Sequence, residues 1–173
     1  WVNLVTDGLP ALALVMDRAD SDVLTRPPRR PDEPMLGRWQ WSTIVLIGFL
    51  DAAVVFAVFA WTLDRHDLAS ARNLAFSTLV IAEVLRAFAA RSTTKTFPQT
   101  GVFGNMTLLG IVFVSVLLQL ALPHVPFMQE LFGLGDLTLS ECALSFAVGL
   151  VPVTVIEISK LIRHACRQEP RWS

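Results

Sequence analysis

Cysteine and histidine are scarce in this chain of 173 residues, which holds only two Cys and three His. Cys142 and Cys166 lack the spacing of metal ligands, so we interpret both as structural. His66, His124 and His164 lie far apart and form no cluster that would hold a metal. The sequence also lacks a Gly-rich nucleotide-binding loop and a Ser, His and Asp arrangement. These absences exclude the commonest enzyme chemistries for the chain taken alone.

Charged residues are also few, at 17%, whereas 53% of the residues are hydrophobic. The mean hydropathy of +0.54 lies above the range of soluble domains and indicates a membrane protein. A membrane-spanning helix needs about 20 mostly apolar residues. Four runs reach this length: 39–63, 71–90, 106–122 and 139–162. We therefore predict an all-α polytopic membrane helical bundle with four full transmembrane helices and the C-terminal half of a fifth.

The remaining segments are shorter or more polar. Residues 1–16 are apolar but too short to span, so we interpret them as the end of a transmembrane helix and the chain as a single C-terminal membrane domain of a longer protein. Residues 17–38 are rich in Pro, Arg and Asp, which predicts a polar, semi-extended loop. Lys and Arg are concentrated in this loop, in the connection 91–105 and in the tail 163–173. We expect these three segments to face the cytoplasm.

Three oxygen-bearing side chains stand at the head of the first apolar segment. Asn3, Thr6 and Asp7 have the spacing i, i+3 and i+4, so on a helix they share one face and can converge on a cation. Gly8 and Pro10 follow, which suggests a helix that loosens and frees backbone carbonyls. A capping or turn cluster is the alternative interpretation. A hard cation such as Ca²⁺ takes six to eight oxygen ligands, so a site here needs further ligands.

Few other ionisable residues lie inside the predicted spans. Glu83, near the middle of the second span, is the best candidate for a further ligand, although Arg86 at i+3 could instead pair with it. For Asp51 we favour a helix-packing or protonated role over ligation. Glu157 and Lys160, near the end of the last span, have the spacing of an interfacial ion pair.

Several segments together resemble one protein family. WVNLVTDGLPALAL followed by DVLTRPPRRPDEPML resembles the sixth membrane helix and the next cytoplasmic loop of P-type cation-transporting ATPases of the calcium-pump type. LAFSTLVIAEVLRAF resembles their eighth helix, and VIEISKLIRH resembles the end of their tenth. Essentially the whole chain is covered, although the seventh and ninth spans match only in hydrophobic pattern. The resemblance is to sarcoplasmic-reticulum-like pumps in a bacterial form, which implies the plasma membrane of a bacterium and a cytoplasmic C-terminus.

The resemblance implies roles for individual residues. The sixth-helix Asn, Thr and Asp of the family bind the cation, which carries over to Asn3, Thr6 and Asp7, and the eighth-helix Glu carries over to Glu83. Keeping all four favours Ca²⁺ as the transported ion, with Mn²⁺ or Na⁺ left open. Arg86 departs from the animal pattern, and its guanidinium could replace one bound cation.

The chain lacks the family's phosphorylated Asp motif, its nucleotide-binding and actuator domains, and its fourth and fifth helices. ATP and Mg²⁺ are therefore expected only in the missing part of the pump, and the sequence leaves enzymatic activity of the chain itself open. The expected function is the C-terminal transport-domain portion of an ATP-driven cation pump. Its expected partners are membrane lipid and the remaining helices and cytoplasmic domains of the same pump, and not nucleic acid. The alternative is a truncated membrane module that packs with partner helices and transports nothing.

Overall fold

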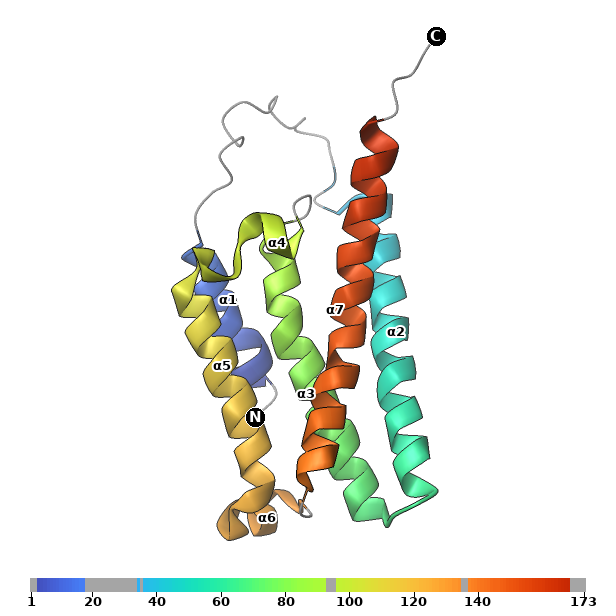
Figure 1. Ribbon diagram of the computed structural model, residues 1–173, viewed down its shortest axis with the longest axis vertical. Helices are drawn as coiled ribbons and strands as arrows, with labels where there is room; N and C mark the ends of the chain where they lie inside the picture. The colour runs from blue at the N-terminus through green and yellow to red at the C-terminus, as the bar shows by residue number, and fades with distance from the viewer. Residues whose placement is uncertain (1–2, 18–33, 35, 93–95, 135–136, 169–173) are drawn as a thin grey trace.

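The long apolar runs fold into helices, because a helix satisfies every backbone N–H and C=O within its own segment and so suits a lipid environment. The structure is a computed structural model that describes residues 3–17, 34, 36–92, 96–134 and 137–168. These residues form helices joined by turns and contain no β-strand, which confirms the predicted all-α polytopic bundle (Figure 1). The longer elements are the π-helix η1 (Asn3–Gly8) and the α-helices α1 (Leu9–Val15), α2 (Arg38–Leu63), α3 (Leu68–Ala90), α5 (Met106–Ala121) and α7 (Leu139–Gln168). Short helices in the connections are α4 (Phe97–Thr100), η3 (Val102–Gly104), η4 (Leu122–His124) and α6 (Pro126–Phe132).

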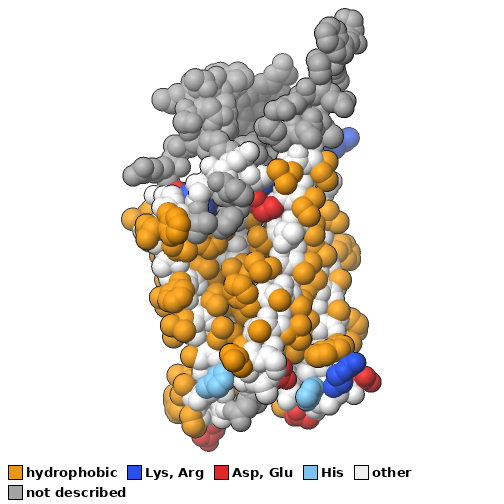
Figure 2. Space-filling view, in the orientation of Figure 1, with side chains coloured by type: hydrophobic (Ala, Val, Ile, Leu, Met, Phe, Trp, Pro, Cys, Tyr) orange, Lys and Arg blue, Asp and Glu red, His pale blue; other side chains and the backbone are white. Residues whose placement is uncertain are grey.

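Among the described residues, four helical segments are long and apolar enough to cross a membrane. They are Gln40–Leu63, Leu68–Ala90, Met106–His124 and Leu139–Ile162. Figure 2 shows hydrophobic side chains over the middle of the visible face and most of the charged ones near its two ends. The protein is therefore an integral membrane protein, and its apolar outer surface is suited to lipid.

Two helix ends differ from the predicted ranges by more than one residue, for identifiable reasons. α3 begins before residue 71, because the Asp67 carboxylate accepts a hydrogen bond from the Ala69 N–H at 3.2 Å and caps the helix there. α7 continues to Gln168, past the predicted end at residue 162, and the next helix-breaking residue in the sequence is Pro170. The helical part thus extends into the segment that the sequence predicted as a tail.

The central element of the bundle is α3. In its most apolar window 72% of the residues are buried, against 17% for α2, so α3 is enclosed by other helices while α2 lies at the edge. α3 contacts α2 and α7 on one side and α1 and α5 on the other (Figure 1). The cluster between α1, α3 and α5 consists of Ala13, Val80, Val84, Ala87, Phe88, Leu108 and Val112.

A glycine brings α3 and α7 together. A Cβ atom added to Gly149 of α7 would lie 3.0 Å from Ile81 Cγ2 and 3.2 Å from the backbone nitrogen of Ala82. Small residues at such positions let membrane helices approach closely, where dispersion contacts replace the hydrophobic driving force that lipid does not supply. The close contact between α3 and α7 therefore depends on the absence of a side chain at Gly149.

Polar contacts fix the end of α1 in the bundle. The Asn105 side chain accepts a hydrogen bond from the Leu108 N–H at 2.8 Å, which caps α5, and donates one to the Ala13 carbonyl of α1 at 2.9 Å. Arg91, which follows α3, pairs with Asp17, which follows α1. α1 is thus held to both of its neighbours at the end opposite to η1.

Candidate functional site

The predicted loosening of the first helix takes the form of a π-helix. η1 covers Asn3–Gly8 and is followed directly by α1, whose second residue is Pro10. Pro10 has no N–H and cannot donate to the carbonyl four residues earlier, which weakens regular α-helical bonding at this point. Single π-helical turns inside membrane helices occur often at functional sites. All three of the oxygen-bearing residues predicted as ligands lie on this π-helix.

The structure places these three residues in different surroundings. Thr6 is buried, whereas Asp7 is exposed on the surface of the bundle. The side chain of Asn3 lies outside the described part of the structure. The exposure of Asp7 means that its carboxylate is accessible to elements other than the helices described here.

The fourth predicted ligand lies on the neighbouring helix. η1 contacts α3, which carries Glu83 in a partly buried position with 25% of its side chain exposed. No three His, Cys, Asp or Glu side chains among the described residues are grouped closely enough to hold a metal ion. Any cation site to which Asp7 and Glu83 contribute is thus incomplete within the described part of this chain.

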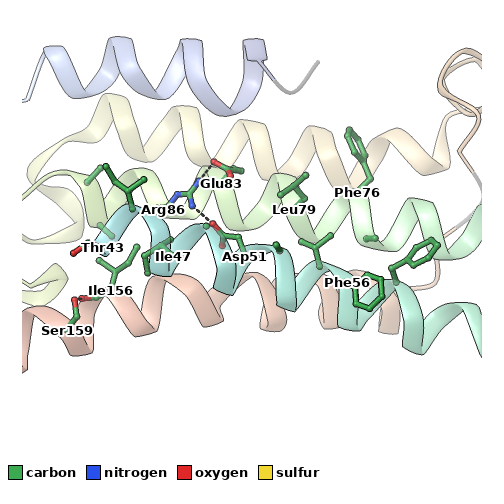
Figure 3. A pocket seen from close by; sticks show the side chains of 18 of the residues that line it. Thr43, Ile47, Asp51, Phe56, Phe76, Leu79, Glu83, Arg86, Ile156 and Ser159 are labelled. Atoms are coloured by element: carbon green, nitrogen blue, oxygen red, sulfur yellow. Dashed lines mark hydrogen bonds and ion pairs between the residues drawn. The ribbon is translucent and has the colours of Figure 1, made fainter. Parts of the chain in front are cut away.

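Glu83 has a cationic neighbour on its own helix. Arg86 donates a hydrogen bond from one terminal nitrogen, Nη2, to Glu83 Oε2. From the other terminal nitrogen, Nη1, it donates to Asp51 Oδ2 of α2 (Figure 3). The ion pair that the sequence offered as the alternative role of Glu83 is therefore present, and the guanidinium also links α2 to α3.

Sequence reasoning anticipated a helix-packing role for Asp51 but missed its partner, Arg86. Asp51 is separated from Arg86 by 35 positions, so no helical spacing indicates the pair. The available signal was the scarcity of charge inside the spans, because a buried carboxylate requires a partner and few cations are present. Asp51 is 8% exposed, and its second oxygen, Oδ1, is buried with no hydrogen-bond partner in the described part of the structure. This unused acceptor is an unusual feature of the cluster, since buried polar atoms are nearly always paired.

Asp51, Glu83 and Arg86 line an elongated cavity between α2, α3 and the end of α7 (Figure 3). The cavity has a volume of about 1680 Å³ and is lined mainly by apolar side chains. Two carboxylates and one guanidinium leave the cluster with one more acidic than basic group. Arg72 and Lys160 also line the cavity, so basic groups outnumber acidic ones along its whole lining.

The predicted ion pair of α7 is confirmed. Lys160 Nζ lies 2.7 Å from Glu157 Oε1 and also donates a hydrogen bond to the Ala89 carbonyl, 2.8 Å away at the end of α3. Cations are favourable near the C-terminal end of a helix, where backbone carbonyls lack intrahelical donors. The pair therefore joins α7 to α3 and has a structural role.

Comparisons with known proteins agree with this architecture. The family described as "Cation transporting ATPase, C-terminus" matches residues 1–162. The chain is 37% identical over 165 residues to a calcium-transporting ATPase of Bacillus subtilis, covering 94% of this chain and 18% of that protein. It is 31% identical over 200 residues to an endoplasmic reticulum calcium ATPase of Aspergillus fumigatus, covering 97% of this chain and 20% of that protein. A probable cation-transporting ATPase of Mycobacterium tuberculosis is 29% identical over 171 residues, with 98% of this chain and 19% of that protein covered.

The chain spans about a fifth of the length of these relatives. The match nevertheless extends over nearly all of the chain and includes the π-helix and all four apolar helices. The chain therefore belongs to the P-type cation-transporting ATPases and corresponds to their C-terminal membrane region.

Proposed function

We propose that this chain is the C-terminal transport portion of an ATP-driven calcium pump and that it contributes part of the intramembrane cation site. The observation that carries the proposal is the contact between η1, which holds Asn3, Thr6 and Asp7, and α3, which holds Glu83. Two relatives are named as calcium-transporting or calcium ATPases, which supports Ca²⁺ as the transported ion.

The proposed ligands have the chemistry that Ca²⁺ requires. Amide, hydroxyl and carboxylate oxygens are hard ligands, and a calcium ion takes six to eight of them. Asp7 is exposed in this chain, so its carboxylate can bind a cation together with ligands supplied by helices of the pump outside this segment. ATP and Mg²⁺ bind to the cytoplasmic parts of the pump and not to this segment.

Arg86 affects how many cations the site needs. Its guanidinium lies against Glu83 and supplies a fixed positive charge there. A carboxylate that already has a positive partner needs less charge from the transported ion. We propose that Arg86 takes the place of one cation, so that the pump carries fewer ions per cycle than a site with Glu83 alone.

The proposed orientation follows from the distribution of basic residues. Lys and Arg are concentrated in the loop after α1, in the connection after α3, and at the C-terminal end of α7 with the residues that follow it. These segments face the cytoplasm in the proposed topology, in the plasma membrane of a bacterium. A tag at the C-terminus should accordingly be accessible only from the cytoplasmic side.

The test uses the full-length protein that contains this chain. Asp7→Asn is expected to abolish Ca²⁺-dependent phosphorylation by ATP, because it removes a ligand charge. The matched control Asp64→Asn alters an exposed carboxylate beyond the end of α2 and should leave the response unchanged. Unchanged Ca²⁺ dependence in Asp7→Asn would contradict the proposal. Uptake of Mn²⁺ or Na⁺ in place of Ca²⁺ would show that the transported ion is not Ca²⁺. Absence of any cation uptake would favour a membrane module that only packs with partner helices.

A further inference from the structure

We propose that Asp51 is a positioning residue for the cation site, acting through Arg86. In this inference Asp51 draws one arm of the guanidinium toward α2 and thereby keeps Glu83 available to a cation. It rests on the proposed function, in which Glu83 is a ligand, but it concerns a residue on a different helix that has no ligand role of its own.

The first step is the way in which the guanidinium is divided. Arg86 gives one terminal nitrogen to each carboxylate, Nη2 to Glu83 and Nη1 to Asp51. Within the described part of the structure, Glu83 interacts with Arg86 through Oε2 alone, so Oε1 remains available as a ligand. The three side chains lie together at the contact between α2 and α3 (Figure 3).

The second step is the arrangement expected without Asp51. An arginine and a carboxylate prefer a bidentate contact, in which two N–H groups bind two oxygens in parallel. Without the Asp51 carboxylate on α2, both terminal nitrogens of Arg86 would bind Glu83 and occupy both of its carboxylate oxygens. A cation would then have to displace a bidentate ion pair, which would weaken cation binding.

The third step concerns the unpaired oxygen of Asp51. Oδ1 is buried and accepts no hydrogen bond in the described residues. It provides a second acceptor for Arg86 when a cation engages Glu83, so the guanidinium can pass from the shared arrangement to a bidentate contact with Asp51 alone. In this proposal Arg86 thus has two arrangements, paired with both carboxylates or with Asp51 alone, and its charge stays beside the site in both.

The test measures the Ca²⁺ concentration for half-maximal phosphorylation in the full-length protein. Asp51→Asn is expected to raise this concentration about fivefold while the maximal phosphorylation is retained, as for neighbouring residues that are energetically coupled. Asp51→Glu should restore most of the affinity, because it keeps the charge. Asp51→Thr should give the same shift as Asp51→Asn and serves if the latter is not produced. The matched control Glu157→Gln, in the ion pair of α7, should cause no shift.

The decisive comparison repeats Asp51→Asn in the background of Arg86→Gln. There the substitution should have no further effect on Ca²⁺ affinity, because Asp51 acts only by holding Arg86. An equal shift in both backgrounds, or no shift in either, would overturn the inference. Glu83→Gln separates the two proposals. A loss of affinity in Glu83→Gln with none in Asp51→Asn leaves the proposed function standing and removes this inference. Unchanged affinity in Glu83→Gln removes this inference and the ligand role of Glu83, and the response of Asp7→Asn then decides the proposed function.

Discussion

Arg91 and Asp17 form a partly buried, two-point ion pair between the ends of α3 and α1. Arg91 Nε lies 2.7 Å from Asp17 Oδ2, and Nη2 lies 3.2 Å from Oδ1. The third nitrogen, Nη1, donates to the Gly101 carbonyl at 2.6 Å, so every arm of the guanidinium is bonded. The side chains are only 6% and 14% exposed, which reduces solvent screening of the pair. The helix that continues η1 is therefore anchored at one end, and the π-helical segment lies at the other.

Loss of this pair should loosen α1. Asp17→Ala leaves a buried guanidinium without its carboxylate and should cost about 3 kcal/mol of local stability, since removing one partner of a buried pair is strongly destabilising. Hydrogen exchange of the α1 amides, measured by mass spectrometry on the full-length protein, should then be about 100-fold faster. The double variant Asp17→Leu with Arg91→Leu should recover part of the loss. Unchanged protection of α1 in Asp17→Ala would show that packing and the Asn105 hydrogen bond hold the helix without this ion pair.

The contact of α3 with α7 gives a second prediction with an internal control. Gly149→Val places methyl groups against Ile81 and the backbone of Ala82 and should lower stability by about 1–3 kcal/mol, the usual cost of overpacking. Gly110→Val makes the same change on α5, where nothing lies within 4 Å of the added Cβ, and should have little effect. Thermal unfolding of the two variants in detergent measures the difference. Equal melting temperatures would mean that α3 and α7 can move apart without loss of stability.

The helices were predictable from the sequence because their cause is local. A run of about 20 apolar residues has to be helical in lipid, whatever its neighbours are. The loosened first helix was also visible, since Gly8 and Pro10 both disfavour regular α-helix and follow the three polar residues directly. The i, i+3 pairs on α3 and α7 followed from the same helical geometry.

The contacts between helices could not be predicted in the same way. Asp51 and Arg86 are 35 positions apart, and Asp17 and Arg91 are 74 positions apart, so no periodicity connects them. Which face of a lipid-exposed helix turns inward depends on packing against the other helices. The hydrophobic pattern of α2 gives little indication of that face, because apolar residues surround the helix on all sides. For this reason the sequence identified Glu83 and Arg86 as neighbours but did not identify Asp51 as their partner.

The cap of α3 gives a prediction for the dependence of stability on pH. The Ser70 hydroxyl donates to Asp67 Oδ1 at 2.5 Å and lowers the pKa of that carboxyl below its ordinary value of 3.8. A carboxyl with a lowered pKa in the folded state stabilises the fold above the pKa of the unfolded chain, and this contribution disappears as the pH falls through the folded-state pKa. The wild type should therefore melt at a higher temperature than Asp67→Ala at pH 7, with the gap narrowing below about pH 4. Ser70→Ala should reduce the difference in melting temperature that Asp67→Ala causes at pH 7. That difference should also disappear at a higher pH than in the wild type, since the Ser70 hydroxyl is the main cause of the lowered pKa. A gap that persists unchanged down to pH 3 would show that the cap depends on side-chain geometry and not on charge.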